Sequence, residues 1–138
     1  MVKRILVTGG RDYRDIGMVE KLLLAAAEQL QPCNDSDIIV THGDCKYQLA
    51  NGEIDPTRSA DHLAAGVADR MGWINDPHPV TTADYDRWGD DAYLQRNTEM
   101  VAMDPDICVV FPGGGGTADC ARKAEAAGIP IMTVASLA

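Results

Sequence analysis

The stretch VVFPGGGGTADCARKAEAAGIPI, residues 109–131, runs from an apolar, β-branched segment through four consecutive glycines into a helical pattern. Glycine has no side chain, so backbone N–H groups in such a loop can approach a ligand closely. The N-terminus of the following helix adds unpaired N–H donors and the positive end of the helix dipole. The tetraglycine is therefore a candidate phosphate-binding loop, and the alternative is a flexible turn that binds nothing.

Strand and helix patterns alternate in the same way along the rest of the chain. Apolar runs predict strands at residues 3–8, 37–42, 106–111 and 129–134, and apolar periodicity predicts helices at 16–30, 60–71, from Asp90 or Asp91 to Met103, and 117–127. Residues 76–89 are rich in proline and predict at most a short edge strand. Strands separated by full helices require crossovers and a parallel sheet covered on both faces. We predict an α/β fold, a single Rossmann-like doubly wound domain over residues 1–138 with a mainly parallel sheet of about five strands.

Composition narrows the classes of function. A chain of 138 residues that is 46% hydrophobic is long enough for one domain with a substantial core. The net charge of −9 argues against nucleic acid as a partner, because such surfaces gain affinity from Lys and Arg. We find no signal peptide and no apolar run long enough for a membrane span, so we expect a cytoplasmic protein without a membrane partner.

The cysteines and histidines do not form a recognisable metal or disulfide pattern. The four cysteines, at positions 33, 45, 108 and 120, contain no CxxC pair, and we expect reduced thiols. A zinc site from His42, Cys45, His62 and Cys120 matches no standard spacing. We therefore predict no metal and no cofactor.

Glycine-containing or polar loops follow three of the predicted strands, at residues 9–15, 43–58 and 112–117. In open parallel sheets, ligands bind outside the carboxyl ends of the strands, so these loops are expected to meet at one site. Neither common nucleotide loop is present. A P-loop requires Lys-Ser/Thr after its last glycine, where Thr117-Ala118 stands, and GxGxxG should follow the first strand, where only Gly9-Gly10 occurs.

Four short motifs, in order along the chain, resemble the SLOG superfamily, and most closely its YspA-type, or cpYpsA-related, branch from bacteria and phages. They are Gly9-Gly10-Arg11, His42-Gly43, Arg96-Asn97 and Pro112-Gly113-Gly114-x-Gly116-Thr117. The resemblance covers nearly the whole chain. It implies a Rossmann-like domain that binds a nucleotide or a nucleotide-derived ligand, such as ADP-ribose or a cyclic relative, and it suggests a homodimer.

The resemblance and the loop positions together give a set of expected ligand-binding residues. These are Gly9, Gly10, Arg11, His42, Gly43, Asp61, Arg96, Asn97, Pro112, Gly113, Gly114, Gly115, Gly116 and Thr117. Within this set, we expect Arg11 to form a bidentate pair with a phosphate, and the alternative is a solvated loop arginine.

Three of these residues also have an ordinary structural explanation. Arg96 is expected to supply charge beside Asn97, or else to form an i,i+3 surface pair with Glu99. Asp61 can bind a ribose hydroxyl, or only favour the dipole of its helix. His42 can contact a base or a diphosphate, or be a satisfied structural histidine.

Some relatives are enzymes, the LOG-type phosphoribohydrolases, which release the base from a nucleoside monophosphate. Their catalytic glutamate lies three residues after the loop threonine, and Cys120 occupies that position here. Asp119 lies one residue earlier, and a shift of one residue rotates a helical side chain by about 100°. We expect Cys120 to be a buried, inert thiol. Hydrolysis would have to rely on Arg96 with Asp119, Asp61 or another carboxylate.

Two functions of different classes therefore remain. The first is a sensor or sequestering module that binds a nucleotide-derived ligand, and the alternative is an N-glycosidase acting on nucleoside monophosphates. A second departure from the relatives is the polar stretch 46–58, followed by Ser59 where they carry glycine. This stretch is either a lid or specificity element, or a tolerated surface insertion.

Overall fold

The computed structural model describes residues 2–30 and 34–137, and its centre is a five-stranded parallel sheet. The strands are β1 (Lys3–Thr8), β2 (Ile38–His42), β5 (Ile74–Pro77), β6 (Ile107–Val110) and β7 (Ile131–Thr133), in the spatial order β5-β2-β1-β6-β7. In the register of the central strands, Ile5 pairs with both Val40 and Ile107. The predicted Rossmann-like, doubly wound α/β fold is confirmed.

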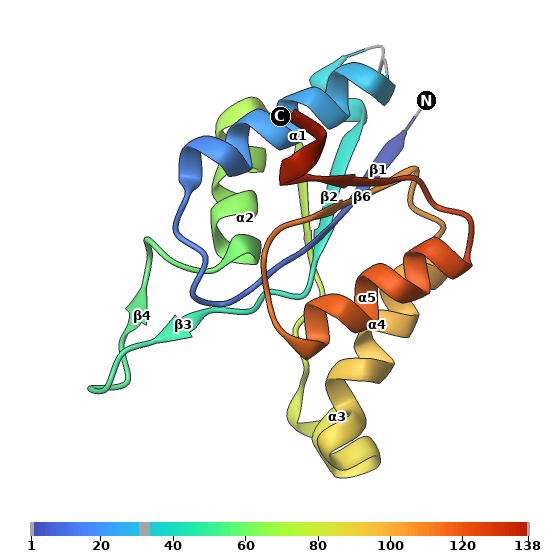
Figure 1. Ribbon diagram of the computed structural model, residues 1–138. Helices are drawn as coiled ribbons and strands as arrows, with labels where there is room; N and C mark the ends of the chain where they lie inside the picture. The colour runs from blue at the N-terminus through green and yellow to red at the C-terminus, as the bar shows by residue number, and fades with distance from the viewer. Residues whose placement is uncertain (1, 31–33, 138) are drawn as a thin grey trace.

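Helices cover both faces of this sheet (Figure 1). Helices α1 (Ile16–Leu30) and α2 (Ala60–Met71) pack on one face, and α4 (Ala92–Ala102) and α5 (Gly115–Ala126) lie side by side on the other. The apolar side chains of α1 recur at helical spacing, and Val19, Leu22, Leu23 and Ala26 are fully buried against the sheet. Ile5 and Val7 of β1 belong to the same core cluster, whereas Leu6 points into a second cluster beneath α4 and α5.

The proline-rich segment contains a helix that the sequence analysis did not predict. Residues 74–77 form the edge strand β5, but Thr82–Trp88 form helix α3. Thr81 caps this helix through a capping box with Asp84, a signal that the neighbouring prolines obscured. The helix ends at Gly89, which has a φ of 58°, and α4 begins only after a 3-10 turn at Gly89–Asp91. The expectation of at most a strand over 76–89 was therefore incomplete.

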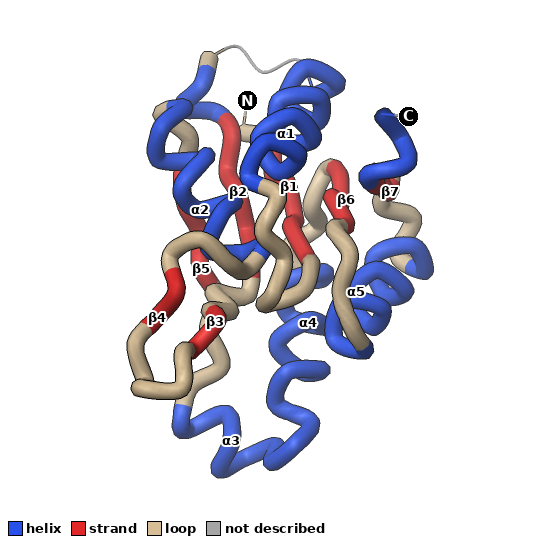
Figure 2. The backbone as a smooth tube through the Cα atoms, turned by 60° about the vertical axis from the view of Figure 1, so that its left-hand side comes forward, coloured by secondary structure: helices blue, strands red, loops and turns tan. Residues whose placement is uncertain are grey.

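The stretch 46–58 folds into a small antiparallel hairpin of β3 (Tyr47–Gln48) and β4 (Ile54–Asp55), which extends away from the main sheet (Figure 2). The guanidinium of Arg58 lies 4.2 Å from the centre of the Tyr47 ring, and its Nε is 3.0 Å from Asp55 Oδ2. These contacts connect the end of the hairpin to its beginning, so the stretch is an ordered element.

Cys108 and Cys120 are buried free thiols, and Cys45 is a half-buried one. The reduced state expected for Cys33 concerns a residue outside the described ranges. Within residues 2–30 and 34–137, no helix combines the length and the apolar character needed to cross a bilayer.

Gly9 follows β1 at a point where backbone and side chains approach closely. A Cβ at this position would lie 2.5 Å from the Cβ of Ala60 and 2.9 Å from the Cβ of Phe111. Gly9→Ala is therefore expected to lower the free energy of unfolding by about 1–3 kcal/mol, the usual cost of overpacking. Denaturant unfolding measures this effect.

Gly66→Ala is the matched control, because its added Cβ would only touch the end of the Arg70 side chain, at 3.4 Å. In the interior of α2 this change should stabilise by about 0.5–1 kcal/mol. Equal effects of the two substitutions would contradict the close packing inferred at Gly9.

Candidate functional site

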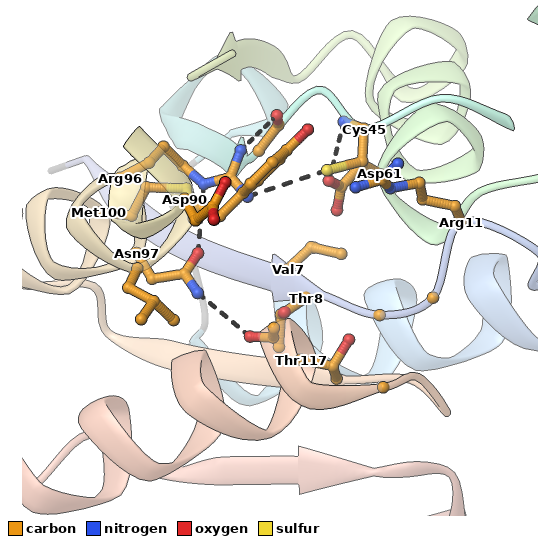
Figure 3. Close-up of a pocket in the computed structure, with 17 residues that line it drawn as sticks. Val7, Thr8, Arg11, Cys45, Asp61, Asp90, Arg96, Asn97, Met100 and Thr117 are labelled. Carbon is orange, nitrogen blue, oxygen red and sulfur yellow. Dashed lines mark hydrogen bonds between the residues drawn. The ribbon is translucent and has the colours of Figure 1, made fainter. Parts of the chain in front are cut away.

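A cavity of about 410 Å³ opens at the carboxyl ends of the central strands (Figure 3). This volume lies within the range of about 300–1,000 Å³ that is typical of ligand pockets. Its lining combines glycine loops, charged groups and an apolar wall: Val7, Thr8, Gly9, Gly10, Arg11, Gly43, Cys45, Asp61, Asp90, Tyr93, Leu94, Arg96, Asn97, Met100, Gly114, Gly116 and Thr117. Figure 3 shows Arg11 and Asp61 on one side and Arg96 and Asn97 on the other.

The tetraglycine leads into α5, and its last two residues, Gly115 and Gly116, are the first residues of that helix. The N–H of Gly10 donates to the carbonyl of Pro112 at 2.9 Å, which connects the loop after β1 to the loop after β6. Gly113 is pressed against Thr117, so a side chain there would collide with it. By contrast, a Cβ at Gly114, Gly115 or Gly116 would have no neighbour within 4 Å.

Gly114 is the N-cap of α5 and offers no side-chain cap. The first N–H groups of an α-helix have no partner within the helix. The loop therefore leaves open space in front of unpaired donors and the positive end of a helix dipole, an arrangement that suits an anion.

Arg11 adds a positive charge at the rim of the cavity. Its guanidinium lies 5.3 Å from the centre of the Tyr93 ring, within the range of a cation–π contact. It makes no ion pair with a carboxylate in the part of the chain that the structure describes. The side chain is thus oriented by an aromatic ring, and its N–H donors remain available to a ligand.

Arg96 projects from α4 into the site and is only 8% exposed. Its Nη1 donates to the carbonyl of Gly43 at 2.7 Å and to that of His78 at 3.3 Å. The position of Gly43 requires glycine, because a Cβ there would collide with this guanidinium. The alternative of a surface pair with Glu99 is therefore wrong, since the side chain is buried and holds two loops together.

Asn97 supports the glycine loop from the same helix. Its Nδ2 donates to the carbonyl of Gly116 at 3.1 Å and to Oδ2 of Asp119 at 3.2 Å. Asp119 also pairs with Lys123 at 2.8 Å and with Arg122 at 3.1 Å. Burial alone would raise the pKa of Asp119, but the hydrogen bonds from Lys123 and Asn97 outweigh it and hold this pKa below its usual value. Asp119 is not among the cavity-lining residues.

Asp61 is the buried carboxylate of the cavity. It lies in the first turn of α2, is 4% exposed, and accepts a hydrogen bond from the Cys45 N–H at 3.1 Å. Burial raises the pKa of Asp61, although this hydrogen bond and the nearby guanidinium of Arg96 act in the opposite direction. The side chain therefore resists ionisation while facing the ligand space, which is a feature of functional carboxylates.

Ser59 positions the loop that carries Cys45. It has a φ of 87°, in the left-handed region that favours glycine. Its hydroxyl donates to the carbonyl of Cys45 and caps α2 by accepting from the N–H of His62. These hydrogen bonds offset the cost of the backbone conformation and place Cys45 beside Asp61.

His42 is fully buried and does not line the cavity. Its Nδ1 accepts from the N–H of Asp44 at 3.0 Å, so the ring proton is on Nε2, which lies 2.7 Å from Oδ1 of Asn75. Because both nitrogen atoms have partners, the geometry favours the structural alternative for this histidine over a ligand contact.

The structure brings most of the expected residues to the cavity, and it adds others. Gly9, Gly10, Arg11, Gly43, Asp61, Arg96, Asn97, Gly114, Gly116 and Thr117 line it, whereas His42, Pro112, Gly113 and Gly115 do not. Among the added residues, Tyr93 and Met100 flank Arg96 and Asn97 on one face of α4. Their i, i+3, i+4, i+7 spacing is the signal that could have identified them.

Cys120 is fully buried in the cluster with Leu6, Met100 and Cys108, so the expected burial of this thiol is confirmed. None of residues 46–58 lines the cavity, but Lys46 lines a smaller hollow beside it, so both explanations of the stretch stay open.

Comparisons with known proteins give one relative and one structural neighbour. No family model matches the chain. The chain is 32% identical over 139 residues to the Gene 61 protein of Mycobacterium phage D29, with 95% of each protein covered. The X-ray structure of TM1055, a structural genomics target, is similar with a TM-score of 0.59 at 15% identity, over 94% of this chain and 72% of that one. At this identity the second likeness shows the fold alone.

Proposed function

The chain belongs to the family of the Gene 61 protein of Mycobacterium phage D29, a relative whose name gives no activity, so we propose a function from the residues that line the cavity of this chain. The protein binds a nucleotide or a nucleotide-derived ligand, such as ADP-ribose or a cyclic relative, as a sensor or sequestering module. The SLOG-like motifs support this proposal, and so does the parallel sheet, because ligands bind at the carboxyl ends of the strands in such folds.

The anion site of the cavity carries the proposal. Gly114 and Gly116 at the N-terminus of α5 line the same cavity as the guanidinium of Arg11, which has no carboxylate partner among the described residues. A phosphate group satisfies both features through backbone N–H groups and a bidentate arginine.

The remainder of the cavity suits a nucleoside. Leu94 and Met100 provide an apolar wall beside the Tyr93 ring, against which a base can pack. Asp61 lies on the other side of the cavity and can accept a hydrogen bond from a ribose hydroxyl. Phosphate, base and ribose each have a complementary surface within one cavity of about 410 Å³.

An N-glycosidase is the second candidate, and Asp61 is the observation that favours it. Asp119 is engaged by Lys123, Arg122 and Asn97 outside the cavity, whereas Asp61 faces the ligand space with a raised pKa, as a general acid requires. Incubation with nucleoside monophosphates, NAD and ADP-ribose, followed by chromatography, separates the two candidates. Release of a free base supports the enzyme, and binding without product supports the sensor.

Ligand-induced thermal stabilisation tests the anion site. ADP-ribose is expected to raise the melting temperature, because a ligand that binds only the folded state stabilises it by mass action. Gly114→Val should remove most of this shift by filling the space before α5, while the unliganded melting temperature changes little because no atom lies within 4 Å of the added Cβ. Differential scanning fluorimetry measures both quantities.

Ala118→Val, on the exposed side of the first turns of the same helix, is the control and should leave the shift unchanged. An undiminished shift in Gly114→Val would show that the tetraglycine does not hold the ligand.

A further inference from the structure

A second, smaller hollow of about 140 Å³ adjoins the main cavity. Arg11, Gly43, Cys45 and Tyr93 line both spaces, so the two meet along these residues. The remaining lining of the smaller hollow comes from the loops after β2 and β5, and consists of Asp44, Lys46, Pro79 and Val80.

The chemistry of the smaller hollow differs from that of the main cavity. Arg11, Asp44 and Lys46 give it three charged side chains, and Lys46 Nζ lies 3.6 Å from Asp44 Oδ1. The apolar wall of Leu94 and Met100 does not extend into it. The carboxylate accepts hydrogen bonds from neighbouring hydroxyls and the ammonium group donates to them, so this space suits a group rich in hydroxyls better than a second base.

Arg11 stands where the two spaces meet. The Tyr93 ring holds its guanidinium at 5.3 Å, and both residues line both hollows. A planar guanidinium can bond two oxygens of one phosphate, or oxygens of neighbouring phosphates. A ligand that occupies both hollows therefore lies against Arg11 where they meet. A diphosphate is the group that suits this guanidinium at that point.

We propose that the smaller hollow binds the terminal sugar of a nucleoside diphosphate sugar whose nucleotide part occupies the main cavity. This inference rests on the proposed function and makes it narrower: the protein selects an extended ligand over a nucleoside monophosphate or diphosphate. Lys46 and Asp44 act as the residues that determine this specificity.

Calorimetric titration with ADP and with ADP-ribose tests the inference. The unmodified protein is expected to bind ADP-ribose about tenfold more tightly than ADP, which corresponds to one well-made additional hydrogen bond. Val80→Trp, in the loop between β5 and α3, fills the smaller hollow and should reduce this ratio to about one, with the affinity for ADP unchanged. Ile54→Trp introduces the same side chain on the exposed hairpin, outside both hollows, and should preserve the ratio.

Lys46→Ala provides a second test with a smaller structural change, because this side chain is 41% exposed. It should lower the preference for ADP-ribose severalfold without affecting ADP. Equal affinities of the unmodified protein for the two ligands, or a preference that survives both Val80→Trp and Lys46→Ala, would overturn the inference and leave the proposed function standing. Failure of the unmodified protein to bind either ligand would overturn both.

Discussion

Arg96→Ala is expected to lose both ligand binding and folding stability, whereas Arg11→Ala should lose binding alone. Each guanidinium faces the cavity, and loss of one charged hydrogen bond to a phosphate weakens binding by about 1.5–3 kcal/mol. Arg96 is in addition buried and bonded to the carbonyls of Gly43 and His78. Its removal leaves these acceptors without that donor and creates a cavity, so the free energy of unfolding should fall by about 2–4 kcal/mol.

Urea unfolding and calorimetric titration of both variants measure the two effects separately. Lys3→Ala and Arg122→Ala remove positive charges that do not line the cavity, and should change binding little. Equal, salt-screened losses in all four variants would indicate diffuse electrostatic attraction in place of two specific contacts. A fully stable Arg96→Ala would contradict the role of this side chain in holding the loops after β2 and β5.

The fold was predictable because its strong signals are local. The apolar strands at 3–8, 37–42 and 106–111 and the periodic helices between them indicate crossovers, and crossovers imply a parallel sheet. Helix α3 was missed because it is short, buries none of its side chains and follows two prolines. Its capping box was the available signal, but a seven-residue helix without an apolar face leaves no periodic pattern.

The glycine-containing loops of the candidate site could be predicted, because the backbone there requires glycine. Contacts between side chains that are far apart in the sequence could not be predicted as well. Gly43 is required by a guanidinium that comes from 53 residues further along the chain, and no local pattern reveals that contact. The same limit applies to His42, whose partner Asn75 lies on the neighbouring strand β5. Which carboxylate faces the cavity also depends on packing: Asp119 is held outside by Lys123, and Asp61 is held inside by Cys45.

Asp61 makes the stability of the protein depend on pH in a defined direction. In the unfolded chain an aspartate titrates near pH 3.9, whereas burial raises the pKa of Asp61 in the folded protein. Between these two pKa values the folded state binds more protons than the unfolded state. The contribution of Asp61 to stability is therefore fully present below about pH 4 and is lost as the pH rises toward the raised pKa of the folded protein.

Asp61→Asn is expected to stabilise the protein at neutral pH while impairing its function. Asparagine keeps the size of the side chain and an oxygen for the Cys45 N–H, but it carries no charge that must be desolvated. The free energy of unfolding should rise by about 0.5–2 kcal/mol, and its decline above about pH 4 should become weaker. Any base release by the unmodified protein should fall by about 10²–10⁴-fold, because the amide cannot donate an acidic proton.

Asp90→Asn is the matched control, since Asp90 lines the same cavity but is exposed, and it should leave the pH dependence of stability unchanged. Urea unfolding of the three proteins across pH 4–8 measures the change in stability, and ADP-ribose titration together with chromatography of released base measures the change in function. A less stable Asp61→Asn at neutral pH would mean that the ionised carboxylate holds the loop at Cys45 in place. A stabilised variant with unimpaired binding and turnover would mean that Asp61 does not act on the ligand. Gain of stability together with loss of function is the outcome we expect if the buried carboxylate of Asp61 acts on the ligand and lowers the free energy of unfolding.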